Sequence, residues 1–211
     1  MNFSRPVLSL LALLSLVMCA VLAGPASASV RSQQRADFSA SVAVAGKKAP
    51  KAKSADDCGD VNVLAGDSSV GSQSATTVCL LNRERTSRGL RALRVNESLS
   101  AAAQAHTNDM VDSRYFAHDS RSGGDVVDRV RSRGYLSNVR SWMVGENLAW
   151  GSGSRSTPGS IVDAWMQSPG HRANILTARF REIGIGLSFG APVSVGGRAA
   201  ATYTTTFGSR N

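Results

Sequence analysis

The sequence is short of cysteine and of aromatic residues: its 211 residues include three Cys, and Phe, Trp and Tyr make up 6%. Beyond the N-terminal region, no apolar stretch approaches the length that a membrane span needs. The sequence has neither an HExxH pair nor a GxSxG segment, which disfavours a zinc protease of that type and a serine hydrolase with a nucleophile elbow. Basic residues are not interleaved with aromatic ones, so nucleic acid is a disfavoured partner.

The N-terminus carries the features of a secretory signal. Arg5 supplies a positive charge, an apolar run follows over residues 7–23, and Ala26-Ser27-Ala28 matches the small residues that precede a cleavage site. We therefore predict a signal peptide over residues 1–28 and an exported, soluble mature chain. A lipid anchor on Cys19 is disfavoured, because Met18 before it is not the small residue that a lipoprotein signal requires.

Residues 29–74 are rich in Ala, Ser, Gly and Lys and almost lack aromatic residues. Such a segment buries little surface, so we predict a disordered linker, with order from about Ala75. Two cysteines remain after the signal peptide, Cys58 and Cys79. In an oxidising compartment an even pair favours a disulfide, which would join the N-terminal segment to the domain, over two buried or free thiols.

The chain has a net charge of +9, of which the signal peptide contributes one unit through Arg5, so the mature chain carries +8. Part of this excess lies in Lys47, Lys48, Lys51 and Lys53. A polyanionic polymer of the cell surface would attract such a protein through a screened, nonspecific field. Solubility alone is the simpler explanation, because basic exported proteins are common.

Helical and strand patterns alternate after the linker. The predicted helices cover residues 76–88, the segment capped by Asn96, residues 125–133, the segment that begins at Thr157-Pro158, and a short one that begins at Ser168-Pro169. The predicted strands cover residues 145–150, 182–189 and 200–207. The small residues on one face of 182–189 would let another element approach closely. Helices that flank a small antiparallel sheet define an α+β fold of layered α-β-α type.

Two of the three histidines and one isolated acidic residue lie in segments punctuated by Gly and Pro: His118, Glu146 and His171. Two neutral imidazoles and a carboxylate form the ligand set of an open site for a divalent cation such as Zn²⁺, with room for water or substrate. The simpler interpretation is that these groups bind one another and the backbone. His106 shares a helical face with apolar residues, so we expect a core histidine.

Other polar residues receive structural interpretations. A nucleophile at Ser168 or Ser120 is disfavoured, since Ser168 is expected to cap a helix. Asn147 is expected to hold a turn through its side-chain amide. Arg172 is expected either to contact a carbonyl or the cleft carboxylate, or to be a surface residue. The two tryptophans at 142 and 165 are expected to serve packing before binding.

The order of the motifs resembles that of the CAP superfamily (cysteine-rich secretory proteins, antigen 5 and pathogenesis-related proteins), in its cysteine-poor bacterial, SCP-like branch. The resemblance covers roughly residues 75–208. The segments that carry it are Asn82-Arg83-Glu84-Arg85, Phe116-Ala117-His118, Gly145-Glu146-Asn147 and Trp165-x-x-Ser168-Pro169-x-His171-Arg172.

This resemblance implies a CAP domain over residues 75–211, folded as a three-layer α-β-α sandwich. It also implies a central cleft in which His118, Glu146 and His171 meet, with Asn147 and Arg172 beside them. A second glutamate of eukaryotic members has no match here, because Ser168 stands at that position. That departure removes a carboxylate and weakens any inference of metal affinity from those relatives.

Three functions remain open at this stage. The first is an exported binding or interaction module, outside the cell or at the cell wall, whose ligand is a lipid, a peptide or a protein. The second is a metal-assisted extracellular hydrolase that acts on peptide or cell-wall material. The third is a purely structural domain that the basic linker holds at an anionic surface.

Overall fold

A computed structural model describes residues 58–211, so the signal peptide and most of the expected linker lie outside the described residues. A four-stranded sheet forms the middle of the domain, in the order β1-β3-β4-β2. Its strands are β1 (Arg94–Val95), β2 (Trp142–Ser152), β3 (Glu182–Phe189) and β4 (Ala200–Arg210). β1 runs parallel to β3, and the other pairs are antiparallel.

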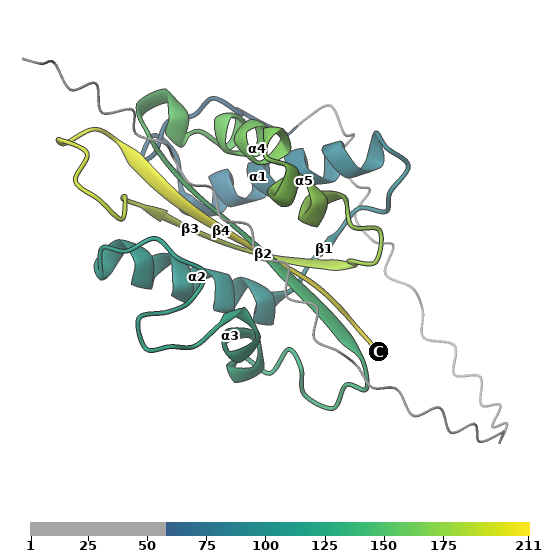
Figure 1. Ribbon diagram of the computed structural model, residues 1–211. Coiled ribbons are helices and arrows are strands. Elements are labelled where there is room, and N and C mark those ends of the chain that lie inside the picture. Colours follow the sequence, from purple (N-terminus) through teal and green to yellow (C-terminus); the bar gives the residue numbers. More distant parts are fainter. Residues whose placement is uncertain (1–57) are drawn as a thin grey trace, which may run out of the picture.

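Helices cover both faces of the sheet. They are α1 (Val70–Thr86), α2 (Glu97–Asp112), α3 (Val126–Ser132), α4 (Pro158–Gln167) and α5 (Pro169–Leu176). Figure 1 shows α1, α4 and α5 on one face and α2 with α3 on the other. The expected three-layer α-β-α sandwich with a mainly antiparallel sheet is therefore confirmed.

Local capping explains where most helices begin. The Asn96 side chain accepts a hydrogen bond from the Leu99 N–H at 3.1 Å, and Thr157 accepts one from Ser160 N–H at 3.2 Å. Asp125 opens α3 with a capping box. α5 does begin after Ser168, but the Ser168 hydroxyl makes no cap hydrogen bond, so the expected capping role of that side chain is wrong.

Helix α1 begins earlier than the apolar pattern predicted, at Val70 instead of residue 76. Ser69 caps it by accepting a hydrogen bond from the Ser72 N–H. Gln73 is fully buried and donates to the Leu64 carbonyl at 2.7 Å. The final part of the segment that we expected to be a linker is therefore folded onto the domain, because polar residues here make capping and buried hydrogen bonds.

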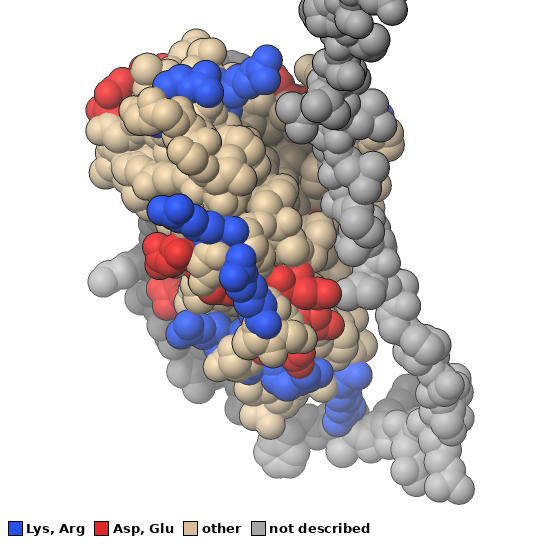
Figure 2. Space-filling view, turned by 60° about the vertical axis from the view of Figure 1, so that its left-hand side comes forward, with Lys and Arg blue, Asp and Glu red and all other residues tan. Residues whose placement is uncertain are grey.

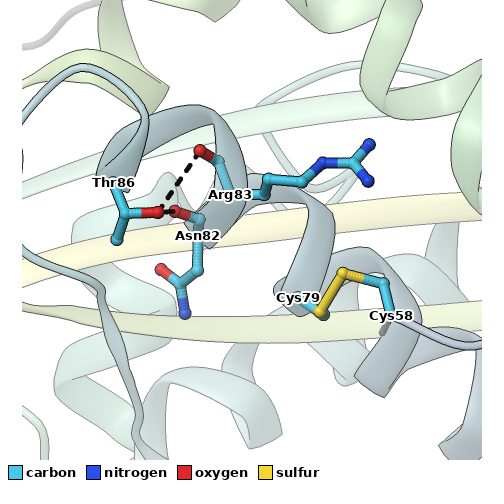
Figure 3. The surroundings of a disulfide bond; sticks show 5 residues. All are labelled: Cys58, Cys79, Asn82, Arg83 and Thr86. Carbon is cyan, nitrogen blue, oxygen red and sulfur yellow. Dashed lines mark hydrogen bonds between the residues drawn. A yellow bond between two sulfur atoms is a disulfide. The ribbon is translucent and has the colours of Figure 1, made fainter. Parts of the chain in front are cut away.

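A disulfide joins this N-terminal segment to α1. The Cα atoms of Cys58 and Cys79 lie 5.4 Å apart, and the two residues are 21 positions apart in the sequence. Figure 3 shows the bridge. The expected bridge is confirmed.

Helix α2 packs directly on the sheet, as the small residues of β3 predicted. A Cβ atom at Gly184 would lie 2.1 Å from the Leu99 carbonyl carbon, and one at Gly186 would lie 2.5 Å from the Ala103 carbonyl carbon. Any larger residue would push the helix away from the sheet.

We predict that Gly184→Ala lowers the free energy of unfolding by about 3 kcal/mol or more, because the new methyl group meets helix backbone that cannot move aside. Urea unfolding followed by circular dichroism measures this change. Gly71→Ala is the matched control, since its Cβ would have only the Ser69 hydroxyl at 3.9 Å as a neighbour. An equal loss in both variants would contradict the packing argument.

We also predict that the double substitution Cys58→Ser and Cys79→Ser lowers the free energy of unfolding by about 3 kcal/mol, from the loop entropy that the bridge removes from the unfolded chain. Urea unfolding of the two proteins under non-reducing conditions tests this. A difference below about 1 kcal/mol would show that the bridge does not constrain the unfolded state in this way.

Candidate functional site

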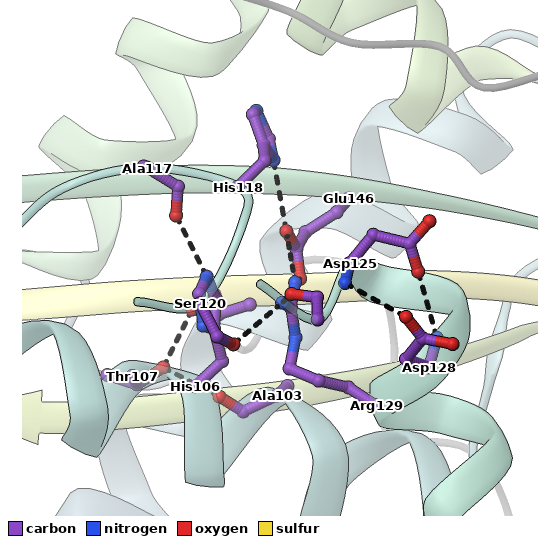
Figure 4. Close-up of polar contacts among 12 residues, drawn as sticks. Ala103, His106, Thr107, Ala117, His118, Ser120, Asp125, Asp128, Arg129 and Glu146 are labelled. Atoms are coloured by element: carbon purple, nitrogen blue, oxygen red, sulfur yellow. Dashed lines mark hydrogen bonds and ion pairs between the residues drawn. The ribbon is translucent and has the colours of Figure 1, made fainter. Parts of the chain in front are cut away.

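The candidate site is built on the edge strand β2, where Glu146 faces the layer that contains α3. The Glu146 side chain is 2% exposed. The Nη2 atom of Arg129, on α3, donates to both of its carboxylate oxygens at 2.9 Å (Figure 4). A guanidinium that reaches both oxygens of a buried carboxylate neutralises it.

This ion pair also anchors the segment that connects α2 to α3, residues 113–125. His118 donates from Nδ1 to Glu146 Oε1 at 3.0 Å. The Nη1 atom of Arg129 donates to the Ser120 hydroxyl at 3.3 Å and to the Gly124 carbonyl at 3.1 Å. The connection is therefore held at His118, Ser120 and Gly124. Figure 4 shows His118 and Ser120 beside the ion pair. We call residues 113–125 the anchored loop.

Asn147 faces the opposite layer, toward α5. Its side chain donates to the His171 carbonyl at 3.0 Å. Asn174, also on α5, donates to the Glu146 carbonyl at 3.1 Å and to the Asn147 side-chain oxygen at 2.9 Å. Asn147 thus ties a strand to a helix, and the expectation that it holds a turn is wrong.

Burial lowers the pKa of two histidines, His106 and His171. For His171 the larger cause is burial, and the charge of His118 lowers the pKa further. Burial also lowers the pKa of His106, against the raising effect of Glu146. His106 is 1% exposed, as expected for a core histidine. Its Nε2 lies 2.9 Å from the Ala117 carbonyl, so a fourth contact fixes the anchored loop.

The expected metal ligands do not fit a divalent cation in this arrangement. Among residues 58–211, no three His, Cys, Asp or Glu side chains are grouped so that they could hold a metal ion. Both Glu146 oxygens already bind Arg129, and a metal ion at the carboxylate would face that positive charge. The His118 imidazole contacts the Glu146 carboxylate directly. Of His171 and Glu146, the hydrogen bonds from Asn147 and Asn174 reach only the backbone carbonyls.

Arg129 is the residue that the sequence interpretation missed. It lies three positions after Val126 and one before Val130, both of which are buried, so helical spacing places it toward the covered face. An arginine at such a position indicates buried acceptors for its donors, either a carboxylate or backbone carbonyls. Arg172, by contrast, is exposed, and its side chain makes no hydrogen bond or ion pair within residues 58–211. The Ser120 hydroxyl is engaged by Arg129, as described above.

The fold and this site define a CAP domain, and comparison with known proteins agrees. The family described as "CAP: Cysteine-rich secretory protein family" matches residues 78–205, so the chain belongs to that family. It is 41% identical over 119 residues to the uncharacterized protein YkwD of Bacillus subtilis, which covers 56% of this chain and 44% of YkwD. The chain therefore spans less than half the length of this relative.

Two solved structures share the fold. One is an extracellular protein of Bacillus anthracis with an SCP domain, 26% identical with a TM-score of 0.51, covering 67% of this chain and 44% of that one. The other is an outer surface protein of Borrelia burgdorferi, 19% identical with a TM-score of 0.51, covering 64% of this chain and 90% of that one. Within residues 58–211, the helices are too short or too polar to cross a membrane.

We predict that Arg129→Gln lowers the free energy of unfolding by about 3–5 kcal/mol, because it leaves the Glu146 charge buried without its partner. Adding Glu146→Gln should recover most of that loss, since the unpaired charge is then removed as well. Urea unfolding at neutral pH of the single and double variants measures the coupling.

The matched control is Arg131→Gln on the same helix, whose ion pair with Asp128 is about 60% exposed on both sides. We expect it to cost below about 0.5 kcal/mol. Equal losses for Arg129→Gln and Arg131→Gln would contradict the role of the buried pair.

Proposed function

We propose that this chain is an exported binding module of the CAP family that acts outside the cell or at the cell envelope. The signal-like N-terminus supports export, and the printed descriptions of the two structural relatives as extracellular and outer-surface proteins support the location. The observation that carries a binding role is the pairing of Glu146 with Arg129. A carboxylate held in that way positions the anchored loop and is not available as a base.

The anchored loop is the surface that we assign to the ligand. Phe116 is 45% exposed, and the neighbouring His118 side chain is 21% exposed. An exposed aromatic side chain on a loop that the ion pair already fixes offers contact area at a small entropic cost. Aromatic residues of this kind often carry much of the energy at protein interfaces. A peptide or protein ligand suits this surface best among the classes expected from the sequence.

Attraction to an anionic cell-surface polymer through the lysines of residues 47–53 remains a proposal, and those residues lie outside the described part of the chain. On the face shown in Figure 2, basic and acidic side chains intermingle over the lower part of the domain. Because the two signs are mixed, this face does not form a continuous positively charged surface. Any broad attraction would therefore depend on the N-terminal lysines.

Binding of the purified full chain to isolated Bacillus subtilis cell walls tests the proposal. We expect Phe116→Ala to weaken cosedimentation about tenfold, because it removes an exposed aromatic anchor. Phe189→Ala is the matched control, since Phe189 is 39% exposed at the end of β3 and outside the anchored loop. Equal binding by the two variants would overturn the assignment of this loop.

The hydrolase alternative has its own test. The full chain is incubated with peptide, ester and glycan substrates in the presence of Zn²⁺, and Glu146→Gln is compared with the parent. Turnover that depends on Glu146 would overturn the binding-module proposal. Lack of turnover together with Phe116-dependent wall binding would support it.

A further inference from the structure

We propose that the end of the sheet where β2 begins and β4 ends is a second binding site, for a sugar that carries a carboxylate or a phosphate. This site lies apart from the anchored loop and does not depend on it. A hollow of about 230 Å³ lies there between the two strand ends and the connection from α5 to β3. Its lining residues are Ser141, Trp142, Arg179, Arg181, Ser209, Arg210 and Asn211.

The hollow has an excess of positive charge. Three arginines line it and no acidic residue does. Within residues 58–211, neither Arg179 nor Arg181 takes part in an ion pair. Arg210 has Glu182 at 3.6 Å, but that carboxylate also accepts a hydrogen bond from Tyr135 at 2.8 Å. The shared Glu182 carboxylate and the terminal carboxylate of Asn211 carry two negative charges against three guanidinium groups, so a net positive charge remains to attract an anion.

Two of the three arginines, Arg181 and Arg210, are held in place before any ligand arrives. Arg181 donates through Nη1 to the Ala178 carbonyl and, at 3.0 Å, to the Phe180 carbonyl, which leaves its Nε and Nη2 donors for a ligand. Arg210 donates to the Tyr135 carbonyl at 2.7 Å and lies over the Tyr135 ring at 4.4 Å. Fixed guanidinium groups bind carboxylate and phosphate through paired hydrogen bonds at a lower entropic cost.

The remaining lining residues favour a sugar over a bare anion. Trp142 is 42% exposed, and an indole offers apolar surface to the C–H face of a sugar ring. Ser141, Ser209 and Asn211 supply donors and acceptors for hydroxyl groups. The volume lies below the range of about 300–1,000 Å³ that is usual for drug-sized ligands, which suits a single ring with its charged group.

Titration of the full chain with a galacturonic acid tetramer, followed by calorimetry, tests the proposal. We expect the double variant Arg179→Ala and Arg181→Ala to bind about tenfold or more weakly, because it removes the charged hydrogen-bond donors. The matched control is Arg155→Ala with Arg198→Ala, which removes the same charge from exposed sites that do not line the hollow. An equal loss in the control would show attraction by net charge alone and overturn the proposal.

The same titration is repeated with neutral maltotetraose and with glucose 6-phosphate. Maltotetraose binding as tight as that of the galacturonate tetramer would contradict the need for an oxyanion. Binding of glucose 6-phosphate but not of the tetramer would assign the site to phosphate, and the reverse to carboxylate; failure of both charged sugars would overturn the site.

Trp142 gives an independent readout of the sugar contact. We expect Trp142→Ala to lose tetramer binding, Trp142→Phe to retain most of it, and both to bind inorganic phosphate like the parent. If Trp142→Ala binds the tetramer unchanged, the sugar assignment is wrong. None of these measurements uses cell walls or Phe116, so this proposal and the binding role of the anchored loop can fail separately.

Discussion

The buried ion pair between Arg129 and Glu146 is the constraint on which this side of the domain depends. It joins α3 to the edge strand β2, and through His118, Ser120 and Gly124 it fixes the connection between α2 and α3. Removing two charges from water is costly, and their attraction compensates only when geometry is good and further hydrogen bonds satisfy both groups. Here the guanidinium reaches both carboxylate oxygens and two loop acceptors, so the pair sets the position of the loop more than it adds stability.

The Gly145-Glu146-Asn147 motif is explained by the alternation of a strand. Consecutive residues point to opposite faces, so Glu146 meets α3 while Asn147 meets α5. At Gly145, a Cβ atom would lie 3.0 Å from the Phe180 ring, so a small residue is needed there. Side chains also occupy the exposed edge of β2, since Asn174 donates to the Glu146 carbonyl and Trp165 to the Leu148 carbonyl. The motif thus holds both helical layers to the strand that lacks a second neighbour.

Sequence patterns predicted the layers, the caps at Asn96 and Thr157 and the close approach at Gly184, because each depends on nearby residues or on strict periodicity. The disulfide was predicted from the even pair of cysteines in an exported chain. They missed the start of α1, where Ser69 and Gln73 act through polar contacts that an apolar pattern does not contain. They placed His118 and Glu146 together, as the structure does, through the family resemblance. They did not find Arg129, since its partner lies 17 residues away and on a different element. A metal site was therefore expected where an arginine supplies the positive charge.

Arg85 shows how the same residue type can be buried in a different way. It is fully buried, and its guanidinium donates to four carbonyls, those of Arg91, Ile175, Thr177 and Phe180. Burial lowers the pKa of Arg85, and the nearby charge of Arg181 lowers it further. Carbonyls satisfy its donors without neutralising its charge, unlike the carboxylate that faces Arg129. Arg85 therefore fixes the connection that carries Arg179 and Arg181 while it adds to the positive potential there. Because the scaffold itself is cationic at this end of the sheet, an anion would find both a fixed geometry and a favourable field.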